Sequence, residues 1–300
     1  MPNLPTLIRP SQTLAAYTSF KVGGSAEFFA APRNLSELQA AIAWAKAQNL
    51  KITCLGAGSN LLISDRGLTG LVICTKYLRG ISFDREKGQV YAMAGESGVS
   101  LARQVAAKGW SGLEWAIGIP GSVGGLVVMN AGAQGGCTAD CLIETEVFSL
   151  SENSSQLLRV PDLDYQYRSS NLQNSDRLVL KATLQLTPDQ DPTVISAKTS
   201  SFLRQRQTTQ PYHLPSCGSV FRNPQPQIIP QSAGQLIEAT GLKGFQVGRA
   251  QVAELHANFI LNLGGATASD IFRLITHVQT EVEQKWGIRL EPEVKMLGFA

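Results

Sequence analysis

The chain has 300 residues, of which 43% are apolar and 16% are charged, and its formal net charge is +3. These values are typical of a globular protein with enough apolar side chains for two or three cores, and they exclude a disordered or fibrous chain. The small net charge, without any run of Lys or Arg, gives no support to a nucleic-acid-binding surface.

The N-terminus shows neither a basic start followed by an apolar stretch nor an Arg-rich amphipathic segment, so we expect a cytoplasmic protein. The cysteines are scattered and odd in number, which argues against a disulfide framework. The histidines are isolated from one another, so no metal site is expected. The cysteines are Cys54, Cys74, Cys137, Cys141 and Cys217, and the histidines are His213, His256 and His277.

The first expected element is an amphipathic helix over 34–49, with Leu38, Ala41, Ile42 and Ala45 on one face. It leads into a strand over 51–55. A second helix is expected near 100–108, where Gly109 stops it. Further strands are expected at 61–63, 71–73, 80–83, 90–94, 144–150, 157–160 and 179–186. The pattern indicates a mixed α+β protein.

The pattern changes at Asp191-Pro192, which is typical of a helix start, and we expect a helix from there to about 207. A proline-rich passage over 211–230 follows. Two more helices are expected, over 232–240 and over 269–286, ended by Gly241 and Gly287. We therefore divide the chain into a domain over 1–190, with parts at about 1–75 and 76–190, and a domain over 191–300.

The segment from Gly118 to Gly125 contains four glycines and one proline, too many breakers for a regular element. Such backbone bends tightly, and its exposed N–H groups suit a phosphate or a flat ring. A tight surface loop is the alternative. The uncharged stretch 115–138 is not a membrane span, because its glycines and Pro120 cost about 8 kcal/mol of helix propensity.

The segment from Gly56 to Leu61 resembles a dinucleotide fingerprint, but Leu61 stands at the third glycine position and no long helix follows. The turn is still suited to wrap a pyrophosphate. Together with the turn at Gly118, it predicts one extended cofactor with a phosphate end.

Three further segments carry chemically useful side chains. Arg168, among tyrosines, can pair with a carboxylate or a developing oxyanion, and a surface Arg stacked on tyrosine is the alternative. Ser219 follows a glycine and can transfer a proton, but it has no adjacent base that would make it a nucleophile. Glu291 and Glu293 lie on an extended segment near the C-terminus, where one can act as acid or base; a solvated strand end is the alternative. Cys217 is interpreted as a small buried residue rather than a nucleophile.

These segments together resemble the flavin-dependent UDP-N-acetylenolpyruvoylglucosamine reductases, over nearly the whole chain and in the same order. The resemblance implies an α+β fold with a two-part FAD-binding region of the vanillyl-alcohol-oxidase (PCMH) type and a smaller substrate domain. The motifs are TSFKVGG at 18–24, LGAGSNLL at 55–62, the passage 118–133, YR-x-S at 167–170, GS-x-F-x-NP at 218–224, GLKG at 241–244, HANF at 256–259 and LEPEV at 290–294.

The resemblance implies that FAD is bound without a covalent link and is reduced by NADPH. It implies reduction of UDP-N-acetylglucosamine enolpyruvate to UDP-N-acetylmuramate, for peptidoglycan synthesis. It assigns proton donation to Ser219, and stabilisation of the enol or enolate to Arg168 and Glu293. The implied flavin contacts are Gly56, Ala57, Gly58, Ser59, Asn60, Leu61, Gly118, Ile119, Pro120, Gly121, Ser122, Gly124, Gly125 and Asn130. The implied substrate contacts are Arg168, Asn223, His256 and Asn258.

The chain departs from the family at two places: Val128 and Gln134 stand where many relatives carry tyrosine, and the long insertion after Arg168 of one subgroup is missing. We expect the shorter subtype, acting as a monomer. Two rival interpretations are a flavin oxidase of the same fold and an inactive FAD-binding module. The presence of Arg168, Ser219 and Glu293 disfavours both.

Overall fold

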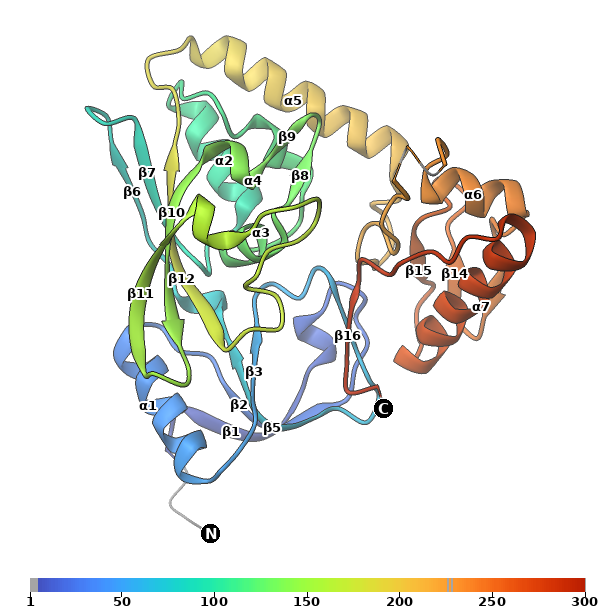
Figure 1. Cartoon of the computed structure of the whole chain (residues 1–300), viewed down its shortest axis with the longest axis horizontal. Helices are drawn as coiled ribbons and strands as arrows, with labels where there is room; N and C mark the ends of the chain where they lie inside the picture. The colour runs from blue at the N-terminus through green and yellow to red at the C-terminus, as the bar shows by residue number, and fades with distance from the viewer. Residues whose placement is uncertain (1–4, 226, 228, 300) are drawn as a thin grey trace. The chain divides into compact units, whose positions relative to one another are not determined.

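The structure is a computed structural model that describes residues 5–225, 227 and 229–299. Its contacts divide the chain into two compact units. Figure 1 colours the chain by residue number, from blue at the N-terminus to red at the C-terminus. Unit 1 comprises Met1–Pro10, Phe28–Ala57 and Gly70–Arg206, and unit 2 comprises Ser11–Glu27, Gly58–Thr69 and Gln207–Ala300. The expected domain boundary at residue 190 stays a prediction.

The elements follow in chain order. The strands are β1 (Ile8–Thr13), β2 (Ser25–Ala30), β3 (Ile52–Leu55), β4 (Leu61–Ile63), β5 (Leu68–Cys74), β6 (Ile81–Asp84), β7 (Gln89–Met93), β8 (Gly132–Ala133), β9 (Gly136–Cys137), β10 (Leu142–Ser149), β11 (Ser154–Arg159), β12 (Arg177–Gln185), β13 (Gln246–Val247), β14 (Ala250–Val252), β15 (Ile260–Asn262) and β16 (Lys295–Leu297). The α-helices are α1 (Leu35–Ala47), α2 (Gly98–Ala107), α3 (Val123–Met129), α4 (Thr138–Cys141), α5 (Pro192–Thr209), α6 (Ala233–Thr240) and α7 (Ala268–Trp286). Short 3-10 turns lie at Ala15–Tyr17, Thr75–Tyr77, Glu114–Gly118 and Val160–Leu163.

Unit 1 is built around an antiparallel sheet in the order β11-β10-β12-β7-β6. One of its cores joins this sheet to α2 and α3, with Val105, Val123, Val127 and Ala182 all buried. Strands β1, β2, β5 and β3 form a second sheet in the order β1-β2-β5-β3. The strands expected at 80–83, 90–94, 144–150, 157–160 and 179–186 are confirmed within two or three residues.

Helix α1 confirms the expected helix at 34–49. Asn34 is its N-cap, since the side chain accepts a hydrogen bond from the Glu37 N–H at 2.9 Å. The predicted apolar face is buried, with Leu38 and Ile42 fully inaccessible. The helix therefore contributes the core of unit 1 that it shares with β5.

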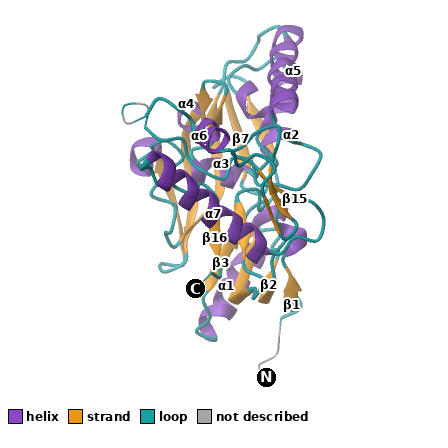
Figure 2. Ribbon diagram, turned by 90° about the vertical axis from the view of Figure 1, so that its right-hand side faces the viewer, coloured by secondary structure: helices purple, strands orange, loops and turns teal. Residues whose placement is uncertain are grey.

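Unit 2 has its core around α7, the long helix labelled in Figure 2. This helix packs against α6, β13 and β14. The predicted stripe on this helix is fully buried, including Ile271, Leu274 and Val278. Gly287 ends the helix with φ +68°, a left-handed conformation that glycine adopts without strain. Strands β13, β14 and β15 form an antiparallel sheet in that order.

The last strand, β16, pairs in parallel with β4, so Lys295 lies opposite Leu61 and Leu297 opposite Ile63. The main-chain N–H of Ser64 continues the pairing by donating to the Leu297 carbonyl at 2.9 Å. Residues 58–69 are thus part of the same unit as the C-terminal residues, more than two hundred positions away in the sequence.

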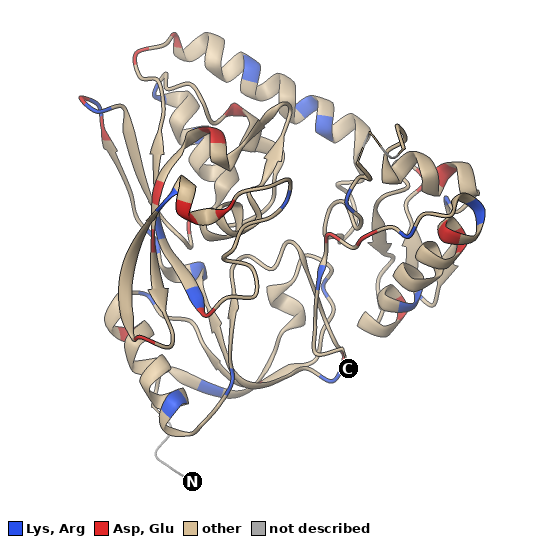
Figure 3. Ribbon diagram, viewed as in Figure 1, with Lys and Arg blue, Asp and Glu red and all other residues tan. Residues whose placement is uncertain are grey.

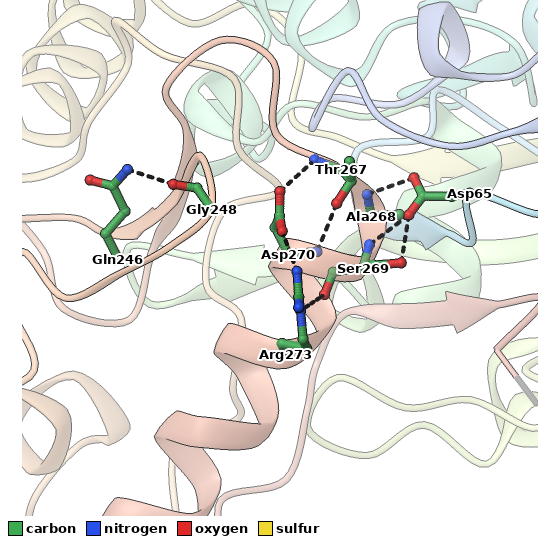
Figure 4. A network of polar contacts seen from close by, with 8 residues as sticks. All are labelled: Asp65, Gln246, Gly248, Thr267, Ala268, Ser269, Asp270 and Arg273. Carbon is green, nitrogen blue, oxygen red and sulfur yellow. Dashed lines mark hydrogen bonds and ion pairs between the residues drawn. The ribbon is translucent and has the colours of Figure 1, made fainter.

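The N-terminus of α7 has a partner for each of its first three N–H groups (Figure 4). Asp65 accepts hydrogen bonds from the N–H groups of Ala268 and Ser269, both at 2.8 Å, and from the Ser269 hydroxyl at 2.6 Å. The N-cap Thr267 accepts from Asp270 N–H at 3.0 Å, and the Asp270 carboxylate accepts from Thr267 N–H at 3.0 Å. Partial burial raises the pKa of Asp65, but these hydrogen bonds outweigh it, and the net shift is downward.

We predict that Asp65→Ala destabilises the protein by about 1 kcal/mol at pH 7, the usual cost of losing a helix cap. Because the pKa of Asp65 is depressed on folding, its contribution is present in full above the unfolded value of about 3.9 and is lost as the pH falls through the folded value. Urea unfolding of both proteins from pH 7 downward measures it. The difference in free energy of unfolding between the two proteins should narrow below about pH 4. The control is Glu86→Ala, which removes an exposed carboxylate in a turn. A difference that stays constant with pH contradicts the prediction.

The expectation that 118–125 contains no regular element is wrong from Val123 onward, where α3 begins. Ser122 makes this possible because its hydroxyl caps the helix, accepting from the Gly125 N–H at 3.3 Å. Gly124 is needed for packing, since a Cβ there would lie 3.0 Å from Ala94 Cβ. Leu126 and Val127 then bury the apolar side of the helix, so tertiary packing outweighs the low helix propensity of glycine.

Candidate functional site

The predicted site residues fall into both units, and each unit gathers its own group. Unit 1 contains Gly56, Ala57, Gly118, Ile119, Pro120, Gly121, Ser122, Gly124, Gly125, Asn130 and Arg168. Unit 2 contains Gly58, Ser59, Asn60, Leu61, Ser219, Asn223, His256, Asn258 and Glu293.

In unit 1 the two glycine segments come into contact. A Cβ at Gly56 would lie 2.5 Å from the Ser122 hydroxyl oxygen, so only glycine allows this approach. The turn that carries Ser122 is fixed to the β7–α2 connection: Gly98 N–H donates to Gly121 O at 3.0 Å, and Val123 N–H to Glu96 O at 2.8 Å. The prediction that these segments serve one ligand requires them to be neighbours, and they are.

The surface beside this contact is open at Gly125. A Cβ at that position would meet only the Ser122 hydroxyl oxygen, at 3.5 Å, beyond its own helical turn. Main chain without side-chain cover is what a flat ring or a pyrophosphate needs for close approach. The residues therefore fit a flavin nucleotide, with bare main chain at Gly125 and a rigid turn at Gly121.

Gly58 continues the first segment into unit 2. Its φ is +67°, and a Cβ there would overlap the main-chain carbonyl oxygen of Tyr17. The Gly58 carbonyl accepts from Ser19 N–H at 3.1 Å. Glycine at 58 is thus required by the fold of the loop itself, before any ligand is considered.

Arg168 is the third residue of a tight turn, in which Gln166 and Ser169 exchange main-chain hydrogen bonds of 3.1 Å. Its φ of +56° lies in a region that turns usually reserve for glycine or asparagine, and such strain costs about 1–3 kcal/mol. The guanidinium donates to Gly132 O at 2.6 Å and lies 5.0 Å from the centroid of the Tyr167 ring. The stacking expected for a surface Arg is present, together with a fixed main-chain contact.

Asn130 ends α3 in a left-handed conformation with φ +40°. Its side chain donates to Gln166 O at 3.1 Å and accepts from Ala139 N–H at 3.0 Å, so it joins the end of α3 to the Arg168 turn. Its contact with a flavin stays a prediction. Val128, one of the two departures, accepts through its carbonyl from the Ser170 hydroxyl at 2.6 Å, whereas Gln134 is exposed with φ +54°.

In unit 2, Ser219 lies on a short extended segment between two others. Ser219 pairs with Phe259 on one side, and Phe221 pairs with Pro292 on the other. Val220 N–H donates to Asn258 O at 2.8 Å, and Val220 O accepts from Glu293 N–H at 2.7 Å. We call the segments 219–222, 258–259 and 291–294 the Ser219 ladder. The structure thus places Ser219, Asn258 and Glu293 side by side.

Asn60 extends this group at the far edge. Its side chain donates to Glu293 O at 3.0 Å, and its carbonyl accepts from Lys295 N–H at 3.0 Å. The surroundings of Glu293 carry mixed charge: burial lowers the pKa of Lys295, the nearby Arg222 lowers it further, and Glu293 acts in the opposite direction. In Figure 3 the segment before β16 carries a basic residue and then two acidic ones, Arg289, Glu291 and Glu293, and Lys295 follows in β16. Glu293 is therefore a carboxylate held near Lys295 on a fixed backbone.

The predicted substrate contacts of unit 2 differ in what they touch. Asn223 is exposed, and its side-chain oxygen accepts from Ala233 N–H, the first residue of α6, at 3.1 Å. His256 packs near Gly234 and against Phe259, and burial lowers its pKa. Asn258 is 4% exposed, and both ends of its amide bind the main chain of Phe221. All three substrate contacts stay predictions.

Cys217 is buried, and burial raises the pKa of its thiol, which agrees with its interpretation as a small core residue. Asn60 and Asn258 each hold the main chain of a neighbouring segment. The sequence does not predict these contacts, because no motif links either residue to the segment that it holds.

None of the helices in the described part of the chain combines the length and the apolar composition that a membrane span requires.

Comparisons with known proteins give one consistent result. The model of an FAD binding domain matches residues 26–152, and the model of the C-terminal domain of UDP-N-acetylenolpyruvoylglucosamine reductase matches residues 210–297. The enzyme of that name from Nostoc sp. is 55% identical over 298 residues, which cover 99% of this chain and 88% of the relative. The one from Acaryochloris marina is 59% identical over 292 residues, covering 97% and 93%.

A solved structure agrees with these relatives. The crystal structure of the reductase from Thermus caldophilus superposes with a TM-score of 0.82 at 34% identity, covering 97% of this chain and 99% of that one. The predicted α+β fold, with an FAD-binding region followed by a second domain, is confirmed. The first family match contains both glycine segments, and the second contains Ser219 and Glu293.

Proposed function

This chain belongs to the UDP-N-acetylenolpyruvoylglucosamine reductase family, and from that premise we propose how its residues divide the work of the reaction. The protein is an FAD-dependent oxidoreductase of peptidoglycan precursor synthesis that uses NADPH. The observation that carries the proposal is the Ser219 ladder, because it holds a hydroxyl and a carboxylate on adjacent, hydrogen-bonded segments.

The glycine segments at 56–61 and 118–125 would hold FAD, which would supply the transfer of a hydride from NADPH to C3 of the enolpyruvyl group. In the proposal, negative charge then spreads from C2 into the carboxylate of the substrate. The Arg168 guanidinium offers N–H groups to the enolate, and Glu293 accepts a hydrogen bond from its enol form. The Ser219 hydroxyl delivers the proton to C2, and solvent replaces that proton afterwards.

The remaining assignments complete the proposal. The glycine segments at 56–61 and 118–125, with Asn130, hold FAD without a covalent bond. Arg168, Asn223 and His256 contact the nucleotide-sugar. We infer a cytoplasmic monomer, as the sequence analysis expects. The support for the flavin assignment is the close approach of Gly56 and Ser122 and the bare main chain at Gly125.

The test uses the purified protein under anaerobic conditions. NADPH should bleach the flavin absorbance, and the enolpyruvyl nucleotide-sugar should restore it. After acid precipitation the yellow colour should stay in the supernatant, because no covalent bond is proposed. Colour retained in the pellet contradicts non-covalent binding, and a bleached flavin that the substrate does not reoxidise contradicts the assigned reaction.

A further inference from the structure

The position of Ser219 depends on a main-chain clamp on its C-terminal side. Phe221 N–H donates to the Asn258 side-chain oxygen at 2.9 Å, and the Asn258 side-chain nitrogen donates to Phe221 O at 2.8 Å. The main chain of Asn258 also accepts from Val220 N–H at 2.8 Å. A single residue therefore holds three main-chain groups of the two residues that follow Ser219.

On the N-terminal side of Ser219, the buried Cys217 donates through its thiol to Leu61 O at 3.4 Å, and Gly218 lies between Cys217 and Ser219. Gly218 has φ +77°, and a Cβ there would find nothing within 4 Å. A glycine in open space has more conformational freedom than any other residue. Gly218 therefore leaves Ser219 a free neighbour on this side, whereas Val220 and Phe221 on the other side are held directly by hydrogen bonds.

The clamp is built for rigidity. Asn258 is 4% exposed and Phe221 is 2% exposed, so water does not compete for these hydrogen bonds. On the opposite edge, Val220 O accepts from Glu293 N–H at 2.7 Å and Arg222 N–H donates to Glu291 O at 2.9 Å. Asn258 consequently fixes the central segment of the Ser219 ladder from one edge, while the Glu293 segment fixes it from the other.

We propose that Asn258 is a positioning residue for proton donation by Ser219, acting through the main chain of Val220 and Phe221. This inference rests on the proposed function of Ser219. It gives the buried amide a task different from direct contact with the nucleotide-sugar. Small displacements of a reacting group cost about a hundredfold in rate, so loosening the clamp should slow the step that uses the Ser219 proton.

The experiment measures reoxidation of the NADPH-reduced holoenzyme by the enolpyruvyl nucleotide-sugar in single-turnover mode. Asn258→Ser should lower this rate constant at least about tenfold. The KM for substrate and the rate of flavin reduction by NADPH should stay within about twofold. Asn258→Asp, which keeps the acceptor for Phe221 N–H and loses the donor, is the second variant in case the first folds poorly.

Asn262 supplies the matched control. It is also 4% exposed, and its side chain donates to Phe20 O at 2.9 Å and accepts from the N–H groups of Gly264 at 2.9 Å and Ala266 at 3.1 Å, all outside the Ser219 ladder. Asn262→Ser should lower Tm by about as much as Asn258→Ser does, but it should not slow reoxidation. Equal slowing by both substitutions would show a general loss of stability and would overturn the proposal.

A double variant separates this inference from the proposed function. In a Ser219→Ala background, Asn258→Ser should cause no further slowing, since the group that it positions is gone. If instead the two substitutions slow reoxidation by factors that multiply, the positioning role is overturned. A raised KM with an unchanged reoxidation rate also overturns it, because that result indicates a direct substrate contact. Normal reoxidation by Ser219→Ala alone would instead overturn the proposed function, and the inference with it.

Discussion

Replacing Ser219 with alanine should leave binding of the enolpyruvyl nucleotide-sugar nearly unchanged and slow turnover by at least about a hundredfold, the usual loss for a positioned proton donor. The structural reason is that Ser219 is held on a hydrogen-bonded ladder next to Glu293. Steady-state assays give KM and kcat, and single-turnover reoxidation assigns the loss to the second half-reaction.

Two controls make this prediction specific. Flavin reduction by NADPH should proceed at the rate of the unmodified protein in both Ser219→Ala and Glu293→Gln, because neither residue is assigned to that half-reaction. Ser219→Cys should recover part of the loss, since a thiol also delivers a proton. Normal turnover by Ser219→Ala would leave proton donation to water or to Glu293, and flavin reduction slowed by orders of magnitude would show that Ser219 serves the other half-reaction.

Elements whose stability comes from their own periodicity were predictable from the sequence. Helices α1 and α7 carry complete apolar stripes, and Asn34 and Gly287 mark an end of each. The strands of the five-stranded sheet were predictable for the same reason. Strand β1 was not, since it contains Pro10 and is mostly exposed, with no alternation of apolar and polar residues.

Helix α3 shows a different limit of sequence reasoning. Propensity argues against a helix that begins with Val123-Gly124-Gly125. The cap by Ser122 and the close packing of Gly124 on Ala94 reverse that preference, and both depend on tertiary structure. A glycine that looks like a breaker in the sequence is here the residue that lets the helix approach the sheet.

The candidate site was predictable as a set of residues but not as an arrangement. The sequence motifs singled out Ser219, which follows Gly218, and Glu293, which precedes Val294, and the family resemblance supplied their roles. The Ser219 ladder and the β4–β16 pairing join residues that are tens to hundreds of positions apart through main-chain groups. Every residue except proline carries the same main-chain groups, so the side-chain pattern holds little signal for such pairing. The tasks of Asn60 and Asn258 became visible only in the structure.

Alanine at Gly58 and alanine at Gly125 should both weaken FAD binding but should change the stability of the protein in opposite directions. Gly58→Ala should lose FAD and lower Tm, because its Cβ would overlap the Tyr17 carbonyl and its φ of +67° strains any other residue. The matched control is Gly241→Ala, where φ is +87° but nothing lies within 4 Å. That substitution should cost only the strain of about 1–2 kcal/mol and should keep the flavin.

Gly125→Ala should stabilise the protein without flavin and weaken the binding of FAD. Alanine favours a helix over glycine by up to about 1 kcal/mol, and the new Cβ meets only the Ser122 hydroxyl, at 3.5 Å. A methyl group on the face against which the cofactor is proposed to lie should weaken FAD about ten- to hundredfold, the range for overpacking by 1–3 kcal/mol. Thermal unfolding of the apoprotein and titration with FAD measure the two effects separately. Unchanged FAD affinity in a stabilised Gly125→Ala protein would place the cofactor away from this face of α3.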